Sequence, residues 1–188
     1  GAVERQADAA VVRQQAERGV NAPTTTSAGR YLDAVSALVG ACDRRTYEGE
    51  PAQRLEGLAR DGTPQPIDIP YKTRSGDRVL DVQTLVRSLA ALTADASAAD
   101  VAATAQHALA SGLATIALDT AAERNVGAVG FTGGVAYNDA ISRQLRTHVE
   151  PSDCSYLQPA AVPPGDGGIA YGQAIVATAR NISVADNR

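Results

Sequence analysis

Aromatic residues are scarce in this sequence, which has no tryptophan, a single phenylalanine and an aromatic fraction of 4%. A hydrophobic core must therefore be built from Ala, Val, Leu and Ile, which the hydrophobic content of 44% supplies. Methionine is missing altogether, and we therefore expect a piece taken from a longer polypeptide. The length of 188 residues suits one domain of common size or two small lobes.

Basic charge is limited as well. The chain has 17 basic and 21 acidic residues, a formal net charge of −4, and Lys72 as its single lysine. Direct binding of nucleic acid requires a basic face, so this charge balance argues against a nucleic-acid partner.

Cysteine is rare too. The two cysteines, Cys42 and Cys154, are far apart in the sequence and form no CxxC pair. We expect two buried thiols, with a disulfide or a catalytic thiol as the alternatives. No apolar run approaches the roughly 20 residues of a membrane helix. No charged and then apolar leader opens the chain. We therefore expect a cytoplasmic protein with no membrane partner.

Apolar periodicity predicts helices over the first two thirds of the chain. In one of them, at 30–39, the apolar residues fall at i, i+3, i+4 and i+7, and Thr26 or Ser27 can cap its start. The segment 61–78 is rich in Gly, Pro and charge, which predicts a loop with an edge strand at 66–71. The predicted helices span residues 3–18, 30–39, 51–60, 81–92 and 98–122.

The last third alternates between short apolar runs and amphipathic segments. It predicts a strand at 126–131, a helix at 138–149, a strand at 155–157 and a helix at 169–180. Strand and helix in alternation indicate an α/β arrangement.

The first strand of this region ends in a pair of glycines, Gly133 and Gly134, and a helix begins near Asn138. Glycine allows a ligand to approach the backbone closely, and a helix N-terminus offers free N–H groups and the positive end of its dipole. The turn therefore suits a phosphate or a nucleoside, and a purely structural turn is the alternative. Asn138 either caps the helix or reaches a ligand with its amide.

A second glycine-rich turn, Pro163–Gly168, holds one carboxylate, Asp166, just before a helix. A lone Asp in that position is either an N-cap or, with glycines clearing space around it, a ligand for a cation. Because a plain N-cap does not need so many glycines, we expect Asp166 to be solvent-accessible and close to the Gly133–Gly134 turn.

Five motifs in a fixed order carry a resemblance over residues 20–180 to the C-terminal stretch of HypF-type carbamoyltransferases, the maturation factors of nickel–iron hydrogenases. In that family the corresponding sequences are close to SSAGRLFDAVAALLG, YEGQAAIELE, Phe-His, LSGGVFQN and VPPNDGGIALGQ. The matching motifs here are TSAGRYLDAVSALVG at 26–40, YEGEPAQRLEGLA at 47–59, Gln106-His107 in the Ala-rich helix, FTGGVAYN at 131–138 and VPPGDGGIAYGQAIVA at 162–177.

The resemblance implies an α/β fold of the actin-like ATPase type. The chain would be a ribonuclease-H-like lobe with an added helical region, incomplete without the upstream lobe. It would form a single C-terminal fragment at 1–188, with a helical and loop subregion at about 20–80 and a ribonuclease-H-like part at about 81–181.

The resemblance also implies site residues. Asp33, Gly49 and Asn138, with the Gly133–Gly134 turn, would bind ATP or carbamoyl-adenylate, and Asp33 and Asn138 would face the same cleft. Asp166 would be one ligand of a divalent metal, which is zinc, iron or magnesium. No residue of the chain is assigned a catalytic role.

Several positions depart from the family pattern. The family's H-x-x-x-H metal element does not occur, and His107 and His148, 41 positions apart, cannot replace it. Arg54 stands where the family often has Glu, and Thr132 keeps the hydroxyl of the family's Ser. Gly165 stands where the family has Asn, and we expect it to loosen the turn before Asp166.

The function that the resemblance implies is transfer of a carbamoyl group from carbamoyl-adenylate to the C-terminal cysteine of a HypE-type partner, with carbamoyl phosphate as the source. The isolated chain is expected to be inactive because the upstream histidines are missing. One alternative is a tRNA threonylcarbamoyl-transferase-like ATPase, which VPPGDGG and the net charge disfavour. A non-catalytic nucleotide-binding scaffold domain also remains open.

Overall fold

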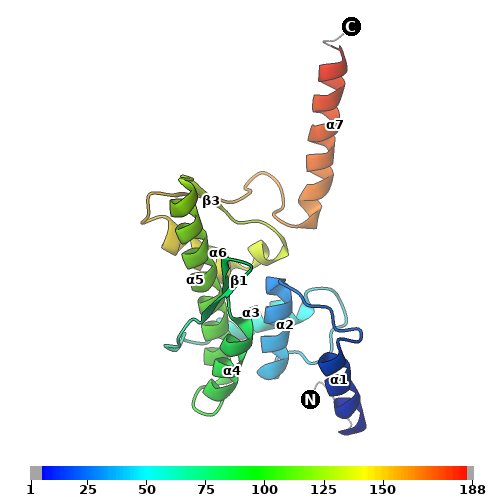
Figure 1. Cartoon of the computed structure of the whole chain (residues 1–188), viewed down its shortest axis with the longest axis vertical. Coiled ribbons are helices and arrows are strands. Elements are labelled where there is room, and N and C mark those ends of the chain that lie inside the picture. The colour runs from blue at the N-terminus through cyan, green and yellow to red at the C-terminus, as the bar shows by residue number, and fades with distance from the viewer. Residues whose placement is uncertain (1–5, 186–188) are drawn as a thin grey trace. The chain divides into compact units, whose positions relative to one another are not determined.

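The computed structural model describes residues 6–185, which form two compact units (Figure 1). Unit 1 ends at Gly112 and unit 2 begins at Leu113, so the division falls inside the long helix α5 (Ala98–Arg124). The subregions expected at 20–80 and 81–181 are a different division of the chain and remain a prediction.

Helices dominate unit 1, and each helix predicted there is found with its ends shifted by a few residues. Of the helix expected at 3–18, residues 3–5 lie outside the described part of the chain. Besides the first part of α5, the helices are α1 (Gln6–Arg18), α2 (Ala28–Leu38), α3 (Glu50–Ala59) and α4 (Val82–Leu92).

Helix α2 shows how local sequence sets these boundaries. The Ser27 hydroxyl accepts a hydrogen bond from the N–H of Arg30 at 3.4 Å and caps the helix start. Gly40, with φ of 72°, follows the helix end in the left-handed region that glycine adopts at little cost. The predicted cap is therefore confirmed for Ser27.

The core of unit 1 lies where α2 packs against α3 and α4 (Figure 1). Tyr31 is also buried, and its hydroxyl donates to the carbonyl of Ala105 at 3.0 Å, which joins α2 to α5. Burial raises the pKa of Tyr31 above its usual value, so the phenol stays a donor. Among the completely buried side chains of this core are Val35, Leu55, Leu85, Leu89 and Val101.

The prediction of an edge strand at 66–71 is wrong. The strands are β1 (Tyr71–Arg74) and β2 (Asp77–Leu80), an antiparallel hairpin in which Tyr71 pairs with Leu80. Ser75 and Gly76 both have positive φ, 52° and 91°, which is the conformation of a two-residue hairpin turn whose twist matches that of the strands.

The segment before this hairpin lies instead along α5. The N–H of Thr63 donates to Asp100 and the N–H of Gln65 donates to Thr104, each at 2.8 Å. Pro66, which has no N–H to donate to a neighbouring strand, lies next in this segment. These side-chain acceptors on α5 satisfy the backbone groups that a strand would have paired.

Unit 2 has the predicted α/β order. Strand β3 (Ala128–Gly130) pairs in parallel with β4 (Ser155–Leu157), and α6 (Asp139–Val149) connects them and packs against β4. A helix that crosses between two parallel strands is a βαβ unit. Spacing of i, i+4 and i+8 places the buried side chains on one face of α6, and these are Ile141, Leu145 and Val149.

Helix α7 (Ile169–Ala185) ends the described chain, and its side chains from 169 to 179 are all exposed. Several of them are large and apolar, so the helix offers an uncovered apolar surface. They are Ile169, Tyr171, Ile175 and Val176, each at least half exposed.

Helix α5 is the one described helix long and apolar enough, by length and composition, to cross a membrane. However, 67% of its apolar window is buried inside the protein. Burial of that kind is typical of a core helix, and the long buried helix expected from the sequence is confirmed.

Candidate functional site

The candidate site in unit 2 starts with the turn that follows β3. Gly133 has φ of 97° and ψ of 177°, a combination that only glycine adopts readily. The chain then forms a short 3-10 helix, η1 (Gly134–Tyr137), before α6. A Cβ on Gly134 would meet no atom within 4 Å, so this side of the turn is open. Glycine is therefore needed for conformation at Gly133 and leaves open space at Gly134.

The carbonyl oxygen of Pro164 connects the two glycine-rich turns. It accepts hydrogen bonds from the N–H of Gly133 at 2.7 Å and from the Thr132 hydroxyl at 2.8 Å. The expectation that the Asp166 loop lies beside the Gly133–Gly134 turn is thus confirmed. The N–H of Gly133 is engaged within the protein, so it is not a free donor for a phosphate. The hydroxyl of Thr132 has a structural use, which explains why a hydroxyl suits this position.

The second turn is crowded rather than loose. A Cβ on Gly168 would lie 2.4 Å from the carbonyl oxygen of Pro163, and one on Gly165 would lie 2.7 Å from Cε2 of Tyr137. The φ and ψ of Gly165, −101° and −153°, are open to any residue. The Tyr137 ring thus occupies the space that a side chain at position 165 would take, and a larger residue there would displace the end of the ring. The expectation that Gly165 loosens the turn is not what the packing shows.

Asp166 is exposed at the start of the short 3-10 helix η2 (Asp166–Gly168), as expected. Its carboxylate makes no hydrogen bond or ion pair with the residues that the structure describes, and it caps neither η2 nor α7. The N-cap interpretation therefore has no support in the geometry. What remains is a carboxylate with all of its acceptor capacity available to solvent or to a cation.

Asn138 is the N-cap of α6. Its Oδ1 accepts from the N–H of Ile141 at 2.9 Å, and the residue is 6% exposed. The structural alternative for Asn138 is therefore confirmed, and a ligand would have to use the amide nitrogen. Ser142 and Gln158 both donate to the carbonyl of Ala136, at 3.0 and 3.2 Å, and so hold η1 in place just before this cap.

In unit 1, Asp33 and Gly49 lie on neighbouring elements, since α2 packs against α3. The Asp33 carboxylate pairs with Arg30 at 2.7 Å and its side chain is 19% exposed. Gly49 has φ of 80° directly before α3, and a Cβ there would meet no atom within 4 Å. Both residues are accessible in principle to a ligand. Whether Asp33 and Asn138 face one cleft stays a prediction, because they belong to different units.

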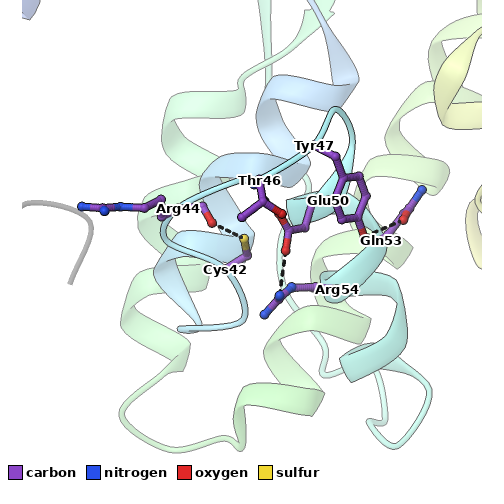
Figure 2. A network of polar contacts seen from close by, with 7 residues as sticks. All are labelled: Cys42, Arg44, Thr46, Tyr47, Glu50, Gln53 and Arg54. Atoms are coloured by element: carbon purple, nitrogen blue, oxygen red, sulfur yellow. Dashed lines mark hydrogen bonds and ion pairs between the residues drawn. The ribbon is translucent and has the colours of Figure 1, made fainter.

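Sequence reasoning missed Glu50, a buried carboxylate next to Gly49 (Figure 2). Its Oε1 pairs with Arg54 at 2.6 Å, and its Oε2 accepts from both the N–H and the hydroxyl of Thr46. The Thr46 N–H, followed by the Thr46 hydroxyl and Arg54, holds the pKa of Glu50 below its ordinary value despite the opposing effect of burial.

This network explains the departure at Arg54. Arg54, which replaces the Glu expected from the family pattern, forms an ion pair with Glu50. The pair belongs to the hydrogen-bonded segment 42–54. In this segment the Cys42 thiol also donates to the Arg44 carbonyl at 3.4 Å (Figure 2). The i, i+4 spacing of Glu and Arg was the signal in the sequence that could have revealed it.

Both cysteines are free thiols, and the expected burial is confirmed for Cys42, whereas Cys154 is half-buried. Neither histidine stands in a group of acidic or thiol ligands. Among residues 6–185 there is no cluster of three or more His, Cys, Asp or Glu side chains able to hold a metal. The described part of the chain therefore fits the contribution of one ligand, the unengaged carboxylate of Asp166, and does not form a complete metal site.

Similarity to solved structures defines the class of fold. The crystal structure of HypF from T. kodakarensis superposes with a TM-score of 0.82 at 35% identity, covering 92% of this chain and 22% of that one. A full-length HypF in a phosphate- and nucleotide-bound form matches with the same TM-score at 24% identity, covering 93% and 23%. The chain thus has the α/β fold of a segment of HypF.

Sequence comparison defines the family. The family described as "Carbamoyltransferase, Kae1-like Domain, second subdomain" matches residues 2–173. Carbamoyltransferase HypF of Rhodobacter capsulatus is 39% identical over 90% of this chain. Probable carbamoyltransferase HypF of Methanocaldococcus jannaschii is 34% identical over 91% of it. This chain belongs to that carbamoyltransferase family, and it spans 22% of the length of each of these two relatives.

Proposed function

We propose that this chain is the nucleotide- and metal-binding part of a carbamoyltransferase that acts in nickel–iron hydrogenase maturation. The full protein would pass a carbamoyl group from carbamoyl-adenylate to the C-terminal cysteine of a HypE-type partner. The observation that carries the proposal is the Asp166 carboxylate, exposed and unengaged, on a loop hydrogen-bonded to the Gly133–Gly134 turn. The names of the relatives and the nucleotide-bound form of one HypF structure support it.

Each unit has groups of its own that suit nucleotide binding. In unit 1, Asp33 offers a carboxylate oriented by Arg30, and Gly49 offers backbone without a Cβ. In unit 2, Gly134 leaves open space in the turn that is hydrogen-bonded to the Asp166 loop, and the Asn138 amide nitrogen lies at the start of α6. An ATP or carbamoyl-adenylate would use these groups for binding and orientation.

Asp166 would donate one carboxylate oxygen to a divalent metal, zinc, iron or magnesium. Such a metal supplies Lewis acidity toward a phosphoryl or carbonyl oxygen. The chain's own contribution is to hold that carboxylate on a loop fixed at Pro164 and to keep it unpaired. The remaining metal ligands, the chemistry that uses carbamoyl phosphate, and the contact with the partner protein would lie in the rest of the enzyme, which we expect in the cytoplasm.

The test is Asp166→Asn in the full-length protein that carries this chain. The substitution keeps the shape and removes the charge of a side chain that makes no intramolecular bond. We expect stability to change by less than about 0.5 kcal/mol while carbamoyl transfer falls by a large factor. The matched control is Asp153→Asn, an exposed aspartate of the same unit, which should leave transfer unchanged. Normal carbamoyl transfer by the Asp166→Asn variant would show that Asp166 is not a metal ligand needed for transfer.

A second test uses this chain alone. Because the described residues form no complete metal site, we expect no enzyme-like hydrolysis of ATP and no enzyme-like release of phosphate from carbamoyl phosphate. Robust turnover that Asp166→Ala abolishes would show that this chain is a complete enzyme. It would contradict the proposal that the remaining metal ligands lie in the rest of the protein. Nucleotide binding by the full-length protein without any carbamoyl transfer would favour the scaffold alternative.

A further inference from the structure

The aromatic ring of Tyr137 lies directly against the backbone of Gly165. A Cβ on Gly165 would be 2.7 Å from Cε2 of that ring and 3.5 Å from both Cζ and the phenolic oxygen. Since the φ and ψ of Gly165 suit any residue, the ring is the group that a side chain at this position would have to displace. The two residues, 28 positions apart in the chain, are therefore in contact.

Burial does not account for this ring. Tyr137 is 56% exposed, and its hydroxyl makes no hydrogen bond with the described residues. An exposed aromatic side chain with one face on a glycine contributes little to a core. Its contact is instead with the residue immediately before Asp166.

Two kinds of contact fix the loop on adjacent residues. The Pro164 carbonyl accepts two hydrogen bonds, from Gly133 and Thr132, and the Tyr137 ring covers Gly165. All three partners belong to the segment 132–137, the first glycine-rich turn and η1. Asp166 follows directly and has no bond of its own to orient it, so its place depends on these two neighbours.

We propose that Tyr137 is a positioning residue whose ring packs against Gly165 and so holds the carboxylate of Asp166 beside the Gly133–Gly134 turn. The inference rests on the proposed function in so far as Asp166 is the group that acts. Misplacement of an acting group by about 1 Å can lower a rate by about 100-fold, so loss of the ring has a measurable effect.

The experiment is a double-mutant cycle in the full-length protein, with carbamoyl transfer as the first readout. Tyr137→Ala removes the ring, and we expect transfer to fall about 10- to 100-fold. Gly165→Ala inserts a methyl group that displaces the exposed ring from the loop, and should cause a loss no larger than that of Tyr137→Ala. The double variant should be no worse than Tyr137→Ala, because the clash disappears with the ring. Tyr137→Phe keeps the ring and should keep transfer within about twofold, since the hydroxyl has no partner.

Hydrogen–deuterium exchange measured by mass spectrometry supplies a readout that does not depend on activity. The N–H of Gly133 donates to Pro164, so its exchange reports whether the loop is seated. We expect faster exchange in the peptide containing Gly133 for Tyr137→Ala and for Gly165→Ala. Tyr137→Phe and Asp166→Asn should both match the unsubstituted protein, because neither removes a contact of the loop.

The outcomes separate the two proposals. If Tyr137→Ala transfers normally and exchanges normally while Asp166→Asn is inactive, the positioning role is wrong and the proposed function stands. If Asp166→Asn is active, the proposed function fails, and the exchange data alone decide whether Tyr137 seats the loop. Additive losses in the double variant would show that Gly165 is needed for a reason other than the ring and would also overturn the inference.

Discussion

Unit 1 and unit 2 differ in how much apolar surface they bury. In unit 1, large side chains from four helices are completely buried, among them Leu55, Leu85 and Leu89. In unit 2, a two-stranded sheet is packed against α6, while Leu157 of β4 remains 56% exposed and α7 is uncovered. Two strands bury too little surface to be stable without further packing. Unit 1 is therefore held by its core, and the candidate site in unit 2 is held by local hydrogen bonds and by a ring on a glycine.

The largest expected effect is on the core of unit 1. Leu55→Ala removes a side chain that is fully buried on α3, and we expect a loss of about 2–5 kcal/mol in the free energy of unfolding. Leu157→Ala is the matched control in unit 2 and should change stability by less than about 0.5 kcal/mol. Urea denaturation of both variants is the measurement. Equal losses would show that the two units are equally well packed.

The core of unit 1 also contains a weak point. Gln106 of α5 is 3% exposed, and neither atom of its amide has a hydrogen-bond partner among the described residues. Leu has a similar volume and no unsatisfied polar group, so Gln106→Leu should stabilise the protein by about 1–3 kcal/mol. The control is Gln83→Leu at an exposed position of α4, which should bring no gain. A destabilised Gln106→Leu variant would mean that the amide has a role.

A smaller effect is expected for Glu50, and it depends on pH. The Thr46 N–H and hydroxyl and the Arg54 guanidinium hold the pKa of Glu50 below 4.5 in the folded protein. The resulting stabilisation is present above the pKa of the unfolded chain and is lost as the pH falls through the folded value. The melting temperature of Glu50→Gln should therefore lie below that of the unsubstituted protein at pH 7. The difference should shrink below about pH 4.5, near the ordinary pKa of Glu. A difference that is constant with pH would contradict the role of the charge.

The smallest effect is expected on α7. Ile175 is 53% exposed, so in this chain Ile175→Ala should change the free energy of unfolding by less than about 0.5 kcal/mol. Urea denaturation next to the Leu55→Ala variant gives the comparison directly. A loss similar to that of Leu55→Ala would show that the apolar face of α7 is packed in solution, and the contrast between the units would disappear.

Local sequence patterns were sufficient for the helices and for the α/β order of the last third. The cap at Ser27 and the left-handed Gly40 depend on residues within a few positions of one another. The expected apolar face of this helix is confirmed at Tyr31 and Val35 and is wrong at Ala34 and Leu38, which are exposed. Strand β4 was located correctly for the same reason. The hairpin at 71–80 was misplaced because the Ser75-Gly76 turn signal was overlooked and because the segment before it bonds to α5, far away in the chain.

The sequence by itself thus determined the family, the positions of the helices to within a few residues and the two glycine-rich turns, since motif order, periodicity and backbone freedom are local properties. The structure decided that Asn138 caps α6, one of the two roles that the sequence left open, that Glu50 is buried while its partner Arg54 stays exposed, and that the Tyr137 ring lies against Gly165. The physical reason is that an amide, a carboxylate or an aromatic ring has several possible partners. Which partner it takes depends on the groups that folding brings within hydrogen-bonding or van der Waals distance.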